Sequence, residues 1–227
     1  SAGNNPGIGG SLARFTVSGN FLYALDDTDM HSVDVSNPVQ PVLETKKTIG
    51  WGIETIFPYG DKLFIGSQNG MFIYSLTNPA SPELLSTFSH VMSCDPVVVE
   101  GDYAYVTLRT GNNCFRGVNQ LDVIDIADAS NPQLVMSYDM YNPGGLGVDN
   151  NLLFICDGTA GLKIYDATDK LSITSHKVAQ YPDLKAIDVI PFNNILMVIA
   201  EDGFYQYDYS DIQNISLLSD IPVVREY

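Results

Sequence analysis

Three carboxylates occupy comparable places in a repeating pattern and could do acid–base chemistry. Glu54 and Asp95 each stand six residues before a Gly-Asp turn, and Asp188 stands five residues before an Asn-Asn turn. A pair of carboxylates that meet over one substrate could act as acid and base on a glycosidic bond, and their oxygens also suit Ca²⁺. The alternative is structural, because Asp and Glu at strand ends accept hydrogen bonds from the backbone. Among 27 acidic residues, three such positions arise easily by chance, so we favour the structural role.

A second group of residues is of the kind that binds partners. Trp51, the only tryptophan, lies between two glycines and is predicted to be either a platform for a sugar or peptide or a lid over packed strands. The third repeat carries a longer connection, residues 108–120, which contains Arg109, Phe115 and Arg116. An insertion confined to one repeat is either functional or the result of drift in a tolerant loop.

The cysteines predict one crosslink. Cys94 opens the third repeat and Cys114 lies in its long connection, so both are expected at the same edge of the fold, within reach of a disulfide. Such a bond would fit an oxidising compartment, whereas two free thiols would fit a cytosolic protein. Cys156 lies in an apolar run and is expected to be a buried, free thiol.

Other chemical motifs are missing from the sequence. The histidines, His31, His90 and His176, lack the spacing of a metal site. There is no Gly-x-Ser-x-Gly elbow, phosphate loop or Cys-x-x-Cys pair. Residues 26–29 resemble part of a calcium loop but lack its Gly and terminal Glu, and we interpret them as a turn. No cofactor is therefore expected, with Ca²⁺ as the alternative, and a non-enzymatic role is favoured over an enzymatic one.

A strand-like apolar core recurs five times and must position these side chains. A turn dipeptide containing Gly or Asn precedes each copy, as tight hairpins require. The second residues of the cores are 41, 41, 49 and 44 positions apart. The five cores are Phe21–Ala24, Lys62–Ile65, Tyr103–Val106, Leu152–Ile155 and Leu196–Ile199.

Each repeat contains four predicted strands, A to D, and A is the innermost. The third strand alternates apolar and polar residues and ends at an Asp or Asn-Pro turn. Units of about 40–45 residues with four strands are typical of β-propeller blades. We therefore predict an all-β, five-bladed β-propeller of four antiparallel strands per blade, closed into a ring. The expected blades are about 11–50, 51–91, 92–140, 141–182 and 183–227, after a flexible tether over residues 1–10.

The third strands resemble the LVIVD repeat, a bacterial β-propeller repeat. Leu121-Asp122-Val123-Ile124-Asp125 is the nearest match, and Met30–Pro38 and Leu162–Asp166 match more loosely. The resemblance implies a propeller in an exported, often lipid-anchored, bacterial protein, and it implies no particular reaction. The N-terminal tether is similar to the segment that follows the lipidated cysteine of such proteins. The expected location is therefore the periplasm or the cell surface, with a leader removed upstream and a lipid anchor as the sole contact with the membrane.

Composition narrows the choice of partners. With 11 basic and 27 acidic residues the formal net charge is −16, which disfavours nucleic acid and anionic membranes. No apolar run approaches the length of a membrane span. We expect a monomer that engages an envelope protein, a peptide or a glycan through the edge carrying the D–A and B–C connections. The alternative is a glycan-active hydrolase that uses Glu54, Asp95 and Asp188.

Overall fold

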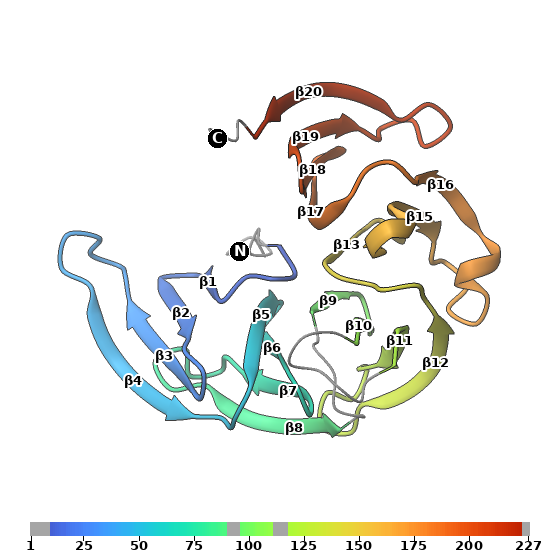
Figure 1. Cartoon of the computed structure of the whole chain (residues 1–227). Helices are drawn as coiled ribbons and strands as arrows, with labels where there is room; N and C mark the ends of the chain where they lie inside the picture. The colour runs from blue at the N-terminus through green and yellow to red at the C-terminus, as the bar shows by residue number, and fades with distance from the viewer. Residues whose placement is uncertain (1–9, 90–95, 111–117, 224–227) are drawn as a thin grey trace.

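The computed structural model describes residues 10–89, 96–110 and 118–223, which form five four-stranded antiparallel sheets (Figure 1). In each sheet the strands pair in chain order. The first two sheets contain β1 (Phe15–Ser18), β2 (Phe21–Leu25), β3 (Asp29–Asp34), β4 (Val42–Thr48), β5 (Ile53–Tyr59), β6 (Lys62–Ser67), β7 (Gly70–Ser75) and β8 (Glu83–Ser89). The third and fourth contain β9 (Val97–Glu100), β10 (Tyr103–Leu108), β11 (Gln120–Asp125), β12 (Gln133–Asp139), β13 (Leu146–Asp149), β14 (Leu152–Cys156), β15 (Leu162–Asp166) and β16 (Lys177–Tyr181). The fifth contains β17 (Ala186–Phe192), β18 (Ile195–Ala200), β19 (Gly203–Asp208) and β20 (Ser216–Pro222).

The predicted hairpin turns join the first two strands of every sheet. In the first three sheets the turn glycine has a positive φ of 58° or 59°. In the last two sheets both asparagines have positive φ, between 51° and 62°. Type II′ turns need positive φ at the first central residue and type I′ turns at both. Glycine followed by Asn or Asp suits the first case, and Asn-Asn suits the second.

The aspartates that end the third strands have the structural role expected from their repetition. Asp34, Asp125, Asp166 and Asp208 each accept a hydrogen bond from the backbone N–H two residues further on, at 2.7–2.9 Å. These hydrogen bonds start the turn into the fourth strand. Side-chain hydrogen bonds from Ser36, Thr168 and Ser210, followed by these backbone hydrogen bonds, hold the pKa of Asp34, Asp166 and Asp208 below the ordinary value.

The hydrophobic core is divided into four seams between consecutive sheets. We call the face of a sheet that is turned toward the following sheet in the chain its trailing face, and the face turned toward the preceding sheet its leading face. Each seam pairs the trailing face of one sheet with the leading face of the next, and its largest residues are fully buried. In the seam between the fourth and fifth sheets, Phe154 and Leu162 pack with Val189 and Leu196. The five blades and their four strands are therefore confirmed as predicted.

The expected closure of the ring is wrong for this structure. The innermost strands pack in the series β1–β5–β9–β13–β17, and among the described residues no comparable strand packing or apolar cluster joins β17 to β1. The sheets follow one another along an arc that begins with β1–β4 and ends with β17–β20 (Figure 1). Residues 10–12 reach the fifth sheet instead, through Asp188. Closure depends on the angle between sheets, which the number of repeats does not determine.

Candidate functional site

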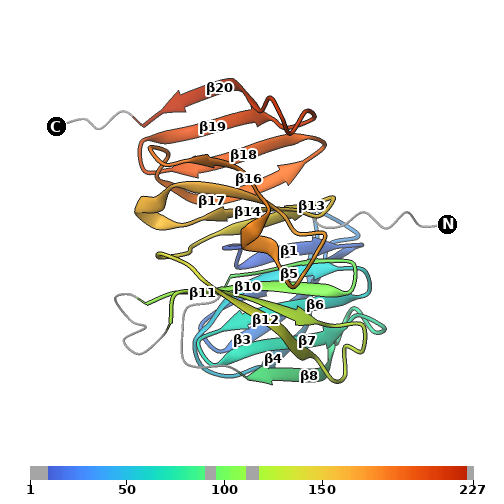
Figure 2. The same cartoon turned by 90° about the vertical axis from the view of Figure 1, so that its right-hand side faces the viewer.

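The loops gather at two opposite edges of the arc (Figure 2). One edge carries the connections between the second and third strands of each sheet and those between consecutive sheets, because antiparallel strands reverse direction at every turn. We call this the loop edge. It is the edge on which the sequence placed Trp51, Arg109 and the long third-sheet connection.

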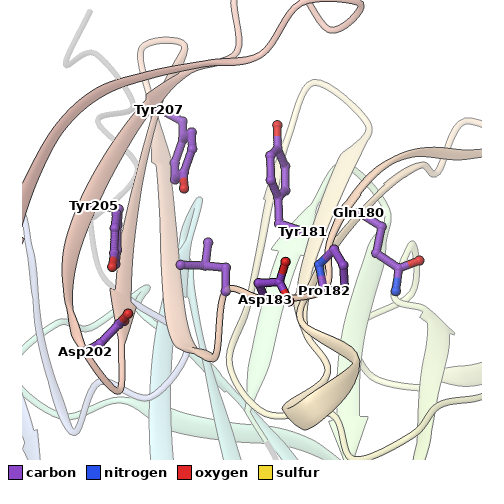
Figure 3. A pocket seen from close by; sticks show the side chains of 8 residues that line it. Gln180, Tyr181, Pro182, Asp183, Asp202, Tyr205 and Tyr207 are labelled. Atoms are coloured by element: carbon purple, nitrogen blue, oxygen red, sulfur yellow. The ribbon is translucent and has the colours of Figure 1, made fainter.

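A pocket of about 320 Å³ opens at the loop edge between the fourth and fifth sheets (Figure 3). We call it the seam pocket. Its walls come from the end of β16, the β16–β17 connection, the β18–β19 turn and β19. The lining residues are Gln180, Tyr181, Pro182, Asp183, Leu184, Asp202, Tyr205 and Tyr207.

Three tyrosine rings form the apolar part of the seam pocket. Tyr205 and Tyr207 come from β19 and face Tyr181 from β16 across the pocket (Figure 3). The ring centroids of Tyr181 and Tyr207 are 5.5 Å apart, and those of Tyr205 and Tyr207 are 6.4 Å apart in a stacked arrangement. Burial raises the pKa of Tyr181 and Tyr207, so both stay neutral at physiological pH. Neutral aromatic faces of this kind attract cations and also stack on sugars.

Carboxylates give the seam pocket a negative potential. Asp183 and Asp202 line it, and Asp220 pairs with Tyr205 across β19 and β20. A hydrogen bond to Asp202 raises the pKa of Tyr205. In the described part of the chain no basic residue forms an ion pair with Asp183 or Asp202, whereas the nearby Lys185 pairs with Glu201 at 3.6 Å. The pocket therefore combines aromatic faces with carboxylates that a cationic group could pair with.

Two of the four binding residues predicted from the sequence, Trp51 and Arg109, lie elsewhere on the loop edge. Trp51 lies in the β4–β5 connection with its side chain largely exposed. Arg109 follows β10 and is half-buried, with its guanidinium beside the backbone of Gly144. Phe115 and Arg116 lie outside the described residues. Trp51 and Arg109 thus belong to different sheets from the seam pocket, and they remain predictions as binding residues.

Two of the three predicted inner-strand carboxylates, Glu54 and Asp188, have separate surroundings. Glu54 lies on β5 and accepts a hydrogen bond from the side chain of Gln68 at 3.1 Å. Asp188 lies on β17 and is buried. Asp95 lies outside the described residues, as do Cys94 and Cys114, so the catalytic set and the disulfide both stay predictions. Cys156 is a buried, free thiol, as expected.

Asp188 ties the N-terminal segment to the fourth and fifth sheets. Its Oδ1 accepts hydrogen bonds from Ser11 Oγ at 2.9 Å and from the backbone N–H of Val189 at 3.0 Å. The backbone N–H of Leu12 points to Oδ2 at 3.4 Å, and Ser11 Oγ in turn accepts from the N–H of Leu146 at 2.8 Å. Both carboxylate oxygens are therefore engaged by the protein itself. This geometry fits the structural role that the sequence favoured for the inner carboxylates.

The burial of Asp188 predicts a measurable pH effect. Burial raises the pKa of this carboxyl above its ordinary value, although its hydrogen bonds oppose the shift. A raised folded-state pKa means that the folded protein holds the proton more tightly, so its stabilising contribution is complete below the unfolded pKa and is lost as pH rises through the folded pKa. Asp188→Asn should remove this loss. We expect the stability of the variant relative to the wild type to be higher at about pH 7 than at about pH 4, as measured by urea unfolding.

The comparison across pH contains its own control. The amide cannot accept hydrogen bonds at both positions, and this cost of Asp188→Asn does not change with pH. It therefore cancels when the same two proteins are compared at two pH values. Parallel stability curves for the wild type and the variant would contradict the raised pKa.

Sequence reasoning missed the seam pocket because its walls come from two repeats. A signal was nevertheless present. The third strand of the fifth repeat, Phe204–Asp208, departs from the repeat pattern, with tyrosines at 205 and 207 on one face. Where one repeat differs from the other repeats, a requirement other than packing within the blade determines which residue is present.

Among the described residues, no group of three or more His, Cys, Asp or Glu side chains could hold a metal ion. Within the same ranges, no helix has the length and apolar character needed to cross a membrane.

The fold and the motif together define the class of this protein. The LVIVD repeat model matches residues 9–47 and 93–140, which confirms the resemblance found in the third strands. The chain is a β-propeller in fold and carries LVIVD repeats in these two segments. No curated protein matches the sequence significantly.

Solved structures with the same fold come from several bacteria. A protein from Lactobacillus plantarum is 12% identical, with a TM-score of 0.68 over 88% of this chain and 67% of its own. The periplasmic gluconolactonase PpgL of Pseudomonas aeruginosa is 12% identical, with a TM-score of 0.67 over 90% of this chain and 68% of its own. BamB from Moraxella catarrhalis is 11% identical, with a TM-score of 0.59 over 91% of this chain and 62% of its own. The chain thus spans 62 to 68% of the length of these three structures, and the likeness establishes the fold alone.

Proposed function

We propose that this chain is a non-enzymatic binding propeller of the bacterial cell envelope, which engages a protein or peptide at its loop edge. The seam pocket takes a basic side chain of that partner. One observation carries the proposal: three tyrosine rings line the same pocket as two carboxylates, and in the described part of the chain neither carboxylate forms an ion pair with a basic residue. The envelope location is supported by the LVIVD repeats and by the fold shared with a periplasmic protein.

The chemistry of the seam pocket favours a cation over other ligands. A Lys or Arg side chain could place its charge near Asp183 and Asp202 and lay its aliphatic stem or guanidinium plane on the tyrosine rings. The net charge of −16 would steer such a partner toward the protein. A neutral sugar could stack on the same rings, but it would draw little from the two carboxylate charges. The glycan is therefore the alternative ligand and becomes an outcome of the test.

Capped tripeptides provide a direct test of the seam pocket. We expect Ac-Gly-Lys-Gly-NH₂ and Ac-Gly-Arg-Gly-NH₂ to bind with a Kd of about 1 mM, roughly −4 kcal/mol, because one side chain fills one pocket. Ac-Gly-Leu-Gly-NH₂ and maltose should bind at least about tenfold more weakly. Chemical-shift changes in ¹H–¹⁵N NMR spectra should fall on Tyr181, Asp202 and Tyr207, and the affinity should fall with added salt.

Isosteric variants separate the pocket from the rest of the loop edge. Asp183→Asn combined with Asp202→Asn should weaken binding of the basic peptides about tenfold or more, since it removes both charges and keeps the shape. Glu44→Gln, an exposed acidic residue on the outer strand β4, is the matched control and should leave binding unchanged. Loss of binding on Trp51→Ala, with the double Asn variant unaffected, would move the site to the β4–β5 connection and overturn the assignment. Equal binding of maltose and the basic peptides would favour the glycan.

A further inference from the structure

The leading face of the first sheet is uncovered where every other leading face is buried. Aligned on the hairpin turns, one position of the innermost strand faces the preceding sheet in all five repeats. In the second to fifth sheets this residue is at most 1% exposed, whereas Phe15 in the first sheet is 67% exposed. Val17, two positions further along β1, is exposed as well. The buried equivalents of Phe15 are Ile56, Val97, Leu146 and Val189.

The trailing face of the fifth sheet is uncovered in the same way. Ile199 on β18 is 49% exposed, although its equivalents in the other sheets are buried. Met197 and Phe204 on the same face are partly exposed, whereas Phe154 and Leu162 at the equivalent places of the fourth sheet are fully buried. Both ends of the arc thus present an apolar surface that, elsewhere in the chain, forms a seam.

The shape of the arc indicates how many further sheets are needed to cover both end faces. The sheets pack in one series, and within the described ranges the fifth sheet does not pack against the first as consecutive sheets pack against each other. The same arc superposes on about 60 to 68% of longer propeller chains. If five sheets cover about 60 to 68% of a complete propeller, the complete ring has about seven or eight sheets, which is within the usual range for propellers. We infer that the two end faces bind further four-stranded blades of the same type, two or three in number, which complete the ring.

The repeated interface argues against a second copy as the occupant. Every seam joins a trailing face to a leading face, so the two end faces differ and complement each other. A dimer whose two-fold axis passes through the junction would place a face against its own copy, which no seam in this chain does. Head-to-tail joining of two copies would give ten sheets, which exceeds the usual blade number of about four to eight.

Appended blades test the inference with probes taken from the chain itself. The full chain is extended after Tyr227, through a short Gly-Ser linker, by one, two or three blades copied from residues 51–91, 51–140 or 51–182. A fourth variant carries four added blades, namely the copy of residues 51–182 followed by a copy of residues 51–91. We expect a sharp optimum at two or three added blades, with a melting temperature about 10 °C or more above that of the unextended chain. Binding of a hydrophobic dye should fall several-fold at the same blade number, because both end faces become covered.

A substitution in the uncovered face provides the control. Phe15→Lys should change the melting temperature of the unextended chain little, because Phe15 is exposed there, and should abolish the gain at the optimal blade number. A steady gain with each added blade, equally present in Phe15→Lys, would overturn ring completion. Sedimentation of the unextended chain as a dimer that Phe15→Lys dissociates would also overturn it, by making a second copy the occupant. None of these readings depends on the seam pocket, so failure here and failure of the proposed function are distinguishable.

Discussion

Replacement of Phe154 by alanine is expected to lower the free energy of unfolding by about 3–5 kcal/mol. Phe154 is 0% exposed and lies in the seam between the fourth and fifth sheets. Its ring meets that of Tyr209 edge-on, with centroids 5.1 Å apart and an interplanar angle of 61°. Alanine would remove the ring and leave a cavity between two rigid sheets that cannot easily move together. Urea unfolding followed by circular dichroism measures the loss.

The repeat supplies a matched control for this substitution. Met197 occupies the place of Phe154 in the fifth sheet, on the uncovered trailing face, and is partly exposed. Met197→Ala should therefore cost about 1 kcal/mol or less, because little packing is lost. An equally large cost at both positions would mean that the trailing face of the fifth sheet is covered in solution. The pair of substitutions thus measures how far a neighbouring sheet stabilises each face.

The local features of this fold could be predicted from the sequence because each depends on a few adjacent residues. The predicted core Phe21–Ala24 lies within β2, and Leu196–Ile199 lies within β18. Alternation with a period of two determines which side chains share a face, and the Gly or Asn dipeptide determines where the strand reverses. Asp34 and its counterparts cap their turns through contacts two residues away. These effects need no knowledge of neighbouring sheets.

Features that depend on the relation between sheets could not be predicted. Ring closure follows from the angle between sheets, which reflects side-chain volumes and twist summed over all seams. The seam pocket brings Tyr181 together with Tyr205 and Tyr207 from the next repeat, and no short-range pattern records that pairing. The sequence also could not indicate that Asp188 accepts a hydrogen bond from Ser11, whose hydroxyl lies 177 positions away in the chain. Long-range partners of this kind decide what a buried carboxylate does.

Removal of the Asp157 carboxylate is expected to destabilise the protein by about 3–5 kcal/mol. Asp157 is 0% exposed and pairs with Lys163, whose side chain is 16% exposed. Its Oδ1 also accepts hydrogen bonds from the backbone N–H groups of Tyr141 and Asn142, at 2.9 and 2.8 Å. One carboxylate thus fixes the connection between the third and fourth sheets to the β14–β15 turn. Asp157→Ala would leave a cation and two N–H groups without their partner at a buried site.

A double-mutant cycle separates the ion pair from the backbone contacts. Lys163→Met keeps the length of the side chain and leaves Asp157 with its two N–H donors, so it should cost less than Asp157→Ala. The double variant has neither the lysine nor the carboxylate, so no buried cation is left without a partner. Its total cost should therefore fall below the sum of the two single costs by about 1–3 kcal/mol. Thermal and urea unfolding of the four proteins provide the values. Additive costs would show that Lys163 contributes nothing through Asp157, and that the two backbone hydrogen bonds alone hold the connection in place.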